Sequence, residues 1–160
     1  MYVFRIITDR PPIKLLNLGR TLEAITAGKI AFFIGNMKTP REYVYLPDAA
    51  IMIVELAERV QAYGQNCNIP GSDVISGHKL VRIAQQASGI NKPVIAIGKV
   101  GLSLLGLFVP AMKEVVEMLY LTEEPLRLSG EKYRRHIGPI PATRPEVGIA
   151  AIIRKLQKKK

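Results

Sequence analysis

Hydrophobic residues along this chain form short runs typical of strands and longer periodic stretches typical of helices. Clusters of β-branched and aromatic residues predict strands at Tyr2–Ile7, Ile30–Ile34, Glu42–Leu46, Gln65–Ile69 and Val94–Ile97. Apolar residues at three- and four-residue spacing predict helices at Ile13–Ala27, Asp48–Gly64, Ser76–Gly89, Leu102–Leu121 and Ser129–His136, with a last helix starting at Thr143. Because strands and helices alternate, the predicted class is α/β, with a single domain over residues 1–157 and a basic tail over 158–160.

Several helix ends carry recognisable capping signals. Asp48, after a proline, is predicted to cap the helix that Gly64 ends, and Ser76 the helix that Gly89 stops. Thr143-Arg144-Pro145-Glu146 has the spacing of a capping box. The helix that follows Asp48 is apolar on nearly every side, so its first half is predicted to be buried on both sides.

Composition narrows the protein class. A chain of 160 residues, 48% of them hydrophobic, can build one domain with a real core. A single cysteine, Cys67, excludes an intrachain disulfide framework. No apolar run reaches the roughly 18 residues of a membrane span, and Arg5 and Asp9 interrupt the N-terminal run that a signal peptide would need. The cytoplasm is therefore the expected compartment.

The positive charge is concentrated near the C-terminus. Residues 1–126 contain 13 basic and 11 acidic residues, whereas residues 127–160 contain 10 basic and 2 acidic ones. Such a surplus is typical either of a nucleic-acid or anionic-membrane contact or of a solvated helix end. No aromatic residues are interleaved with the lysine tail, which argues against a single-strand binding platform.

Self-contained catalytic motifs are missing from the sequence. It has no phosphate-binding loop and no G-x-G-x-x-G pattern, and none of its tyrosines has a lysine four residues later. Two histidines, His78 and His136, are too few for a histidine-rich metal site. No catalytic, cofactor-binding or metal-ligating residue is therefore predicted in this chain.

The most informative stretch runs from Pro40 to Ala50. Arg41 follows a turn, where its guanidinium could hold a phosphate or carboxylate through two hydrogen bonds. Asp48 lies at a helix start, where it could accept hydrogen bonds from the first turn. On residue chemistry alone, an ordinary surface arginine and an ordinary helix cap are the favoured alternative.

This stretch resembles the Arg-x-Tyr-x-x-x-x-Asp-x-Ala pattern of the extended short-chain dehydrogenase/reductases, the NAD-dependent epimerase/dehydratase family. Other segments resemble that family in the same order along the chain, and they are Gly28–Asn36, Asn68–Gly71, Ser76–Gly89, Ser129–Gly138 and Pro141–Ile153. The resemblance implies the C-terminal part of a Rossmann-like fold, namely the last sheet strands and a small substrate-binding subdomain. The family's N-terminal dinucleotide-binding βαβ units and its catalytic Tyr-x-x-x-Lys pair have no counterpart in this sequence.

The resemblance also implies roles for particular residues. Arg41 corresponds to a substrate-contacting, phosphate-binding arginine of nucleotide-sugar members, with Tyr43 a weaker substrate contact and Asp48 a structural member of the motif. NAD(P) is implied for a complete family member, and no cofactor for this chain alone. The apolar region Leu102–Leu128 leans toward an apolar or unusual substrate, with packed core or oligomer surface as the alternative.

Three functions follow as hypotheses. The first is the substrate-binding half of an NAD(P)-dependent epimerase/dehydratase-like protein, expected to be truncated and inactive alone. The second is a non-enzymatic oligomerisation or interaction module, and the third is a basic nucleic-acid-binding domain. Because the apolar helix after Asp48 needs cover, the expected partner is a second copy or a separate N-terminal half. No membrane is expected, and nucleic acid is the least favoured partner.

Overall fold

The fold is described from a computed structural model that covers residues 18–106 and 127–158. Its centre is a two-stranded parallel sheet of β1 (Ala31–Ile34) and β4 (Val94–Ile97), in register from Ala31 opposite Val94 to Ile34 opposite Ile97. Parallel strands need a long crossover connection, and here residues 35–93 supply it. The predicted strand Tyr2–Ile7 lies outside the described residues, as does most of the predicted helix Leu102–Leu121.

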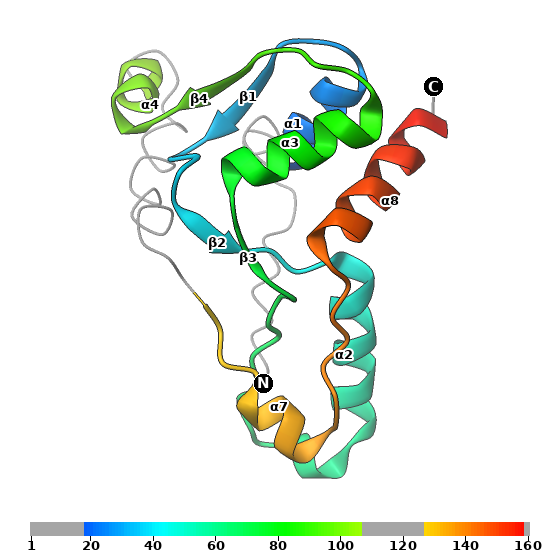
Figure 1. Ribbon diagram of the computed structural model, residues 1–160. Coiled ribbons are helices and arrows are strands. Elements are labelled where there is room, and N and C mark those ends of the chain that lie inside the picture. Colours follow the sequence, from blue (N-terminus) through cyan, green and yellow to red (C-terminus); the bar gives the residue numbers. More distant parts are fainter. Residues whose placement is uncertain (1–17, 107–126, 159–160) are drawn as a thin grey trace.

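Three helices cover one face of this sheet. α1 (Leu18–Thr26) and α3 (Gly77–Ser88) lie beside it, and α8 (Pro145–Lys158) packs across both (Figure 1). The buried core between them is almost entirely aliphatic; it comprises Leu22, Ile25, Ala31, Phe33, Met37, Ile75, Leu80, Val81, Ala84, Ile149 and Ile153. The amphipathic stripes read from the sequence therefore meet in one core, as expected for an α/β protein.

A short antiparallel ladder lies below the parallel sheet. β2 (Pro40–Glu42) pairs with β3 (Val74–Ser76), with Arg41 opposite Ile75 (Figure 1). The predicted strands Glu42–Leu46 and Gln65–Ile69 are therefore wrong. The observed strand β2 ends at Glu42, where the first predicted strand begins, and residues 65–69 form no regular secondary structure. Strand pairing explains both errors. Val74–Ser76 pairs with Pro40–Glu42, and the residues next to these strands have no partner strand among the described residues.

α2 (Leu46–Glu58) forms the lower part of the molecule with the 3₁₀ turn η2 (Val60–Ala62) and α7 (Glu131–His136) (Figure 1). The helix predicted after Asp48 is present as α2, but the prediction that its first half is buried on both sides is wrong. Ile51 and Val54 are 48% and 55% exposed, whereas Ala49 and Met52 are buried. One face of α2 is thus an apolar surface in contact with water.

The capping of α3 is confirmed. The Ser76 hydroxyl accepts a hydrogen bond from the backbone N–H of Lys79 at 3.2 Å, and Gly89 ends the helix with φ of 70°. The last helix also has its proline in the first turn, as predicted. The predicted capping box is wrong at its first residue, because the helix begins at Pro145 and the Thr143 hydroxyl donates to Asp48 instead.

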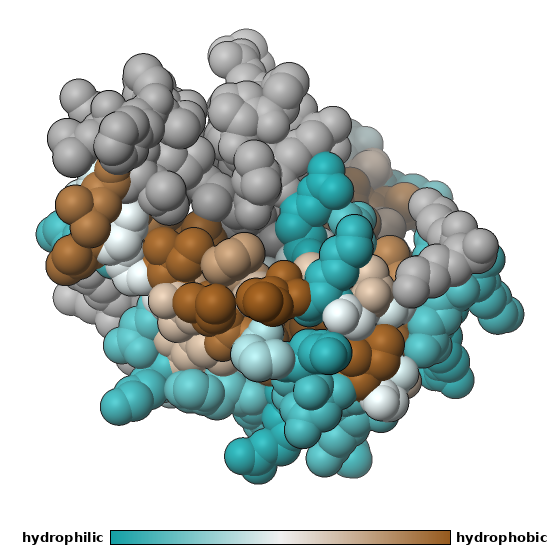
Figure 2. All heavy atoms as spheres, turned by 90° about the horizontal axis from the view of Figure 1, so that it is seen from above, coloured by the Kyte–Doolittle hydropathy of each residue, from teal (hydrophilic) through white to brown (hydrophobic). Residues whose placement is uncertain are grey.

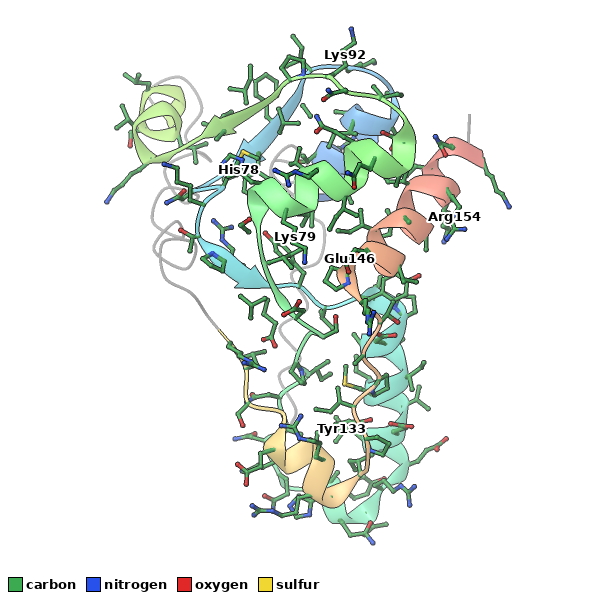
Figure 3. The ribbon with its side chains drawn as sticks, viewed as in Figure 1. His78, Lys79, Lys92, Tyr133, Glu146 and Arg154 are labelled. Carbon is green, nitrogen blue, oxygen red and sulfur yellow. The ribbon has the colours of Figure 1, made fainter. Side chains whose placement is uncertain are left out.

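Tyr133 links α7 to α2 through packing and a hydrogen bond. Its ring is fully buried, and its hydroxyl donates to the carboxylate of Glu55; in Figure 3 the side chain points from α7 toward α2. Burial and the neighbouring Glu55 carboxylate raise the pKa of the Tyr133 hydroxyl, so the phenol stays neutral and remains a donor. Tyr133 and Glu55 are 78 residues apart in the sequence, so their hydrogen bond is a long-range link between the two helices.

Substituting Tyr133→Phe removes only this hydroxyl. We expect the free energy of unfolding to fall by about 1.5 kcal/mol, since the bond is to a charged group. Urea denaturation would measure the change, and Tyr63→Phe is the matched control, because the Tyr63 hydroxyl donates to the Ala57 carbonyl at an exposed site. A loss in Tyr133→Phe no larger than in Tyr63→Phe would contradict this role.

Candidate functional site

Arg41 lies in β2 with its side chain against the end of β1. Its Nη2 donates to the Asn36 carbonyl at 3.5 Å, and its guanidinium carbon is 5.9 Å from the centre of the Phe33 ring. Phe33 is buried, so the ring offers a fixed surface for the planar guanidinium. Arg41 itself is half-buried. Sequence reasoning selected this residue, and the structure places its side chain beside the carboxyl end of the parallel strand β1.

The turn after β1 brings the chain back to that position. Gly35 has φ of 90° and donates its N–H to the Ile97 carbonyl at 2.9 Å, which joins the ends of β1 and β4. The Asn36 side chain then accepts from the Lys38 N–H at 2.9 Å, a local bond typical of a tight turn. β2 therefore starts beside the strand ends rather than across the molecule.

The carboxyl ends of β1 and β4 are also where ligand binding is expected. In open α/β folds, ligands bind outside the carboxyl ends of the parallel strands. Here α4 (Lys99–Gly106) starts two residues after β4, so its N-terminus lies at the same edge. Arg41, Asn36 and the start of α4 thus surround one edge of the sheet.

Tyr43 lies two residues after Arg41 and is half-buried against the core. Its hydroxyl is buried, and the part of the chain that the structure describes offers it no hydrogen-bond partner. Burial raises the pKa of Tyr43, and the nearby Arg41 charge opposes that rise. The phenol is therefore neutral at ordinary pH. Its role as a substrate contact stays a prediction.

Asp48 is buried in the first turn of α2 but caps nothing there, so the predicted helix cap is wrong. Its carboxylate accepts two hydrogen bonds from Thr143, one from the backbone N–H at 2.7 Å and one from the hydroxyl at 2.8 Å. Ser72 in turn donates its hydroxyl to the Thr143 carbonyl at 2.6 Å. Asp48 therefore clamps the segment before α8 onto the start of α2.

Two further polar residues hold the chain near Arg41, and sequence reasoning missed both. The Glu42 carboxylate accepts from the Leu128 N–H at 2.8 Å, and the Asn68 amide donates to the Ser129 carbonyl at 3.1 Å. Their partners lie 86 and 61 residues away, so no local spacing could have revealed them. They tie residues 128–129 to the β2 end of the site.

An ion pair joins α3 and α8. Lys79 of α3 and Glu146 of α8 are 3.1 Å apart and point toward each other in Figure 3. A backbone hydrogen bond at its own position and the Lys79 ammonium lower the pKa of Glu146. Both side chains are about half exposed, so the pair orients the helices more than it stabilises them.

Other residue types that could bind a metal or take part in catalysis are sparse among the described residues. Within residues 18–106 and 127–158, no group of three or more His, Cys, Asp and Glu side chains could hold a metal ion. His78 and His136 are exposed at the surface, and Cys67 lies in a partly exposed irregular segment rather than in a strand. No helix among the described residues is long and apolar enough to cross a membrane.

Comparison with known proteins finds similarity at the level of structure alone. No protein-family model and no curated protein matches the sequence. A UDP-glucuronic acid 4-epimerase from Bacillus cereus, solved with UDP-glucuronic acid and NAD, matches over 88% of this chain and 39% of its own, with a TM-score of 0.67 and 14% identity. A putative epimerase from Burkholderia cenocepacia matches over 88% of this chain and 41% of its own (TM-score 0.61, 14% identity).

A third match is RMD from Pseudomonas aeruginosa, solved with NADPH, with a TM-score of 0.58 and 10% identity. It covers 88% of this chain and 40% of the RMD chain. The present chain thus spans about two fifths of the length of each of these proteins. The fold predicted from the resemblance, the C-terminal part of a Rossmann-like extended short-chain dehydrogenase/reductase fold, is confirmed.

Proposed function

We propose that this chain is the substrate-binding part of an NAD(P)-dependent epimerase-like protein, and that Arg41 binds an anionic group of the substrate. The observation that carries the proposal is the position of Arg41 at the carboxyl end of β1, beside Asn36 and on the ring of Phe33. That edge is where ligands bind in open α/β folds. The structurally similar Bacillus cereus protein contains UDP-glucuronic acid and NAD.

A phosphate-bearing sugar nucleotide is the substrate class that suits Arg41. A guanidinium can give a phosphate two parallel hydrogen bonds, and this geometry is favoured when the group is held in one orientation. Phe33 beneath the guanidinium and the Asn36 carbonyl beside it provide that orientation. Lysine would keep the charge at this position but lose the paired geometry.

The described residues do not fit the cofactor itself. A dinucleotide pyrophosphate needs glycines at a strand-to-helix turn so that backbone N–H groups can approach it. The turn between β4 and α4 contains Gly98, whereas Gly101 lies in the first turn of α4, where an added Cβ would lie 3.1 Å from the side chain of Ile97 at the end of β4. We therefore propose that NAD(P) binding and hydride transfer belong to a part of the protein other than the described residues.

The test is direct binding of UDP to the purified chain by isothermal titration calorimetry at low salt. We expect Arg41→Ala to weaken UDP binding about tenfold or more, and Arg41→Lys to recover only part of that loss, because one charged bidentate contact is removed. Arg82→Ala is the matched control, since Arg82 is exposed on α3. It should leave the affinity unchanged.

Two results would overturn the proposal. One is a chain that binds no UDP at millimolar concentration, which would favour the non-enzymatic interaction module. The other is an Arg41→Ala variant that binds as tightly as the unaltered chain. Salt-sensitive binding of DNA, lost when residues 154–160 are removed, would instead favour the nucleic-acid hypothesis.

A further inference from the structure

α3 and α8 lie side by side and run in the same direction. Near their N-terminal ends the Lys79 ammonium and the Glu146 carboxylate are 3.1 Å apart. Near their C-terminal ends the Gln157 amide donates to the Ser88 carbonyl at 3.3 Å. In Figure 3 Lys79 and Glu146 reach toward each other from the two helices. The outward sides of α3 and α8 therefore adjoin each other along their length.

Each of these helices has a stripe of exposed side chains on its outward side. Successive members of a stripe are three, four or seven residues apart, and such spacings place side chains on the same side of a helix. All six are exposed, and they are Lys79, Arg82 and Gln86 on α3 and Val147, Arg154 and Lys158 on α8. We call these six side chains the α3–α8 surface. The apolar residues Ile149 and Ile153 of α8 are buried in the core instead.

The two helices are strongly cationic. Residues 77–88 and 144–158 contain six basic residues and one acidic residue, a net charge of +5, which is half of the +10 of the whole chain. The acidic residue, Glu146, is paired with Lys79. Seen from above, hydrophilic residues gather along the lower and right-hand edges of the molecule (Figure 2). A concentration of positive charge on this scale attracts an acidic partner and speeds its association.

Stabilisation of the helices themselves explains only part of this charge. Lys155 and Lys158 lie in the last turn of α8, where the helix dipole favours cations. Arg144, however, directly precedes α8, where the dipole favours anions, and Arg82 lies in the middle of α3, where the dipole has little effect. The helix dipole therefore gives no reason for a cation at these two positions, whereas an acidic partner does.

An apolar side chain among the cations indicates the kind of partner. Val147 is 57% exposed and lies between Arg144 and Arg154 along α8. Protein interfaces combine a buried apolar anchor with a charged rim. Contacts to a nucleic-acid backbone go to phosphate and sugar oxygens, and they would leave Val147 without an apolar partner. A membrane takes up the apolar face of an amphipathic helix, and that face of α8 is buried in the core.

We infer that the α3–α8 surface binds an acidic amphipathic helix of a partner protein. Carboxylates of that helix face Arg82, Arg154 and Lys158, and one of its apolar side chains covers Val147. A helix suits this surface because its side chains recur every three or four residues, as the two stripes do. The inference goes beyond the proposed function. Since the α3–α8 surface does not include Arg41, UDP binding can hold or fail independently of it.

The test is binding of a labelled 18-residue helical peptide, with glutamates beside a leucine stripe, measured by fluorescence anisotropy at physiological salt. The triple substitution Arg82→Gln, Arg154→Gln and Lys158→Gln should weaken binding about tenfold, because three exposed charge pairs are lost. Val147→Ser keeps the charge and should weaken binding about threefold through the lost apolar contact. The same peptide with glutamine in place of glutamate should bind the unaltered chain about tenfold more weakly.

A second triple variant is the matched control for net charge. Lys99→Gln, Lys132→Gln and Arg134→Gln remove three exposed cations from α4 and α7, away from α3 and α8 (Figure 1), and should leave the peptide affinity unchanged, since salt screens distant charges. The inference is overturned if the peptide does not bind at millimolar concentration, or if both triple variants weaken it equally. Tighter binding of a mixed-sequence DNA duplex or of phosphatidylserine vesicles to the same surface would also overturn it.

Discussion

Replacing Asp48 by alanine should lower the free energy of unfolding by about 3 kcal/mol. The substitution removes both hydrogen bonds from Thr143, at 2.7 and 2.8 Å, at a position where the carboxylate is buried. The backbone N–H of Thr143 would lose its acceptor, and an unsatisfied buried donor costs more than the bond itself contributes. The segment before α8 would then lose this link to α2. Urea denaturation with an unchanged m-value would give the loss directly.

Two further variants separate the clamp from the helix. Thr143→Val removes the hydroxyl donor and leaves the backbone bond, so about half of the loss is expected. Glu58→Ala, on an exposed position of the same helix, should change stability by no more than about 0.5 kcal/mol. If Asp48→Ala behaves like Glu58→Ala, the clamp does not hold the two helices together.

Replacing Gly71 by alanine should destabilise the protein by about 3 kcal/mol, because there is no room for a Cβ. The added atom would lie 2.8 Å from the carbonyl carbon of Tyr43, 2.9 Å from the Cγ of Glu42 and closer still to the Tyr43 carbonyl oxygen. The Tyr43 contacts are to backbone directly after β2, so the end of that strand would have to shift. The change is measurable as a lower midpoint of urea unfolding.

Gly98→Ala is the matched control for this prediction. A Cβ at Gly98 meets nothing within 4 Å, so alanine should be neutral or slightly stabilising there. Because the shifted strand contains Arg41, Gly71→Ala should also weaken UDP binding, whereas Gly98→Ala should not weaken it. Equal stability of the two variants would show that the loop at Gly71 yields at little cost.

Local sequence patterns predicted some elements well, because the capping residues and apolar runs that define these elements lie within a few residues of each other. Ser76 and Gly89 bracket α3 through bonds and backbone angles within the helix's own ends, and the apolar run Val94–Ile97 forms β4 as expected. The resemblance likewise predicted the fold that the structural comparisons show. Arg41 was selected by its motif, and the structure added the ring of Phe33 and the carbonyl of Asn36 around it.

Tertiary structure decided what depends on distant partners. The sequence by itself determined the α/β class, the ends of α3 and the residue types available at the Arg41 edge, since these follow from hydrophobic period and short-range capping. It could not determine that Asp48 binds Thr143, 95 residues away, or that Val74–Ser76 is the strand beside Pro40–Glu42. Nor could it show that Phe32 and Ile95 lie opposite each other in the parallel sheet and are both about half exposed. Hydrogen-bond partners and burial depend on which distant segments lie together in the folded protein, and local sequence spacing does not specify this.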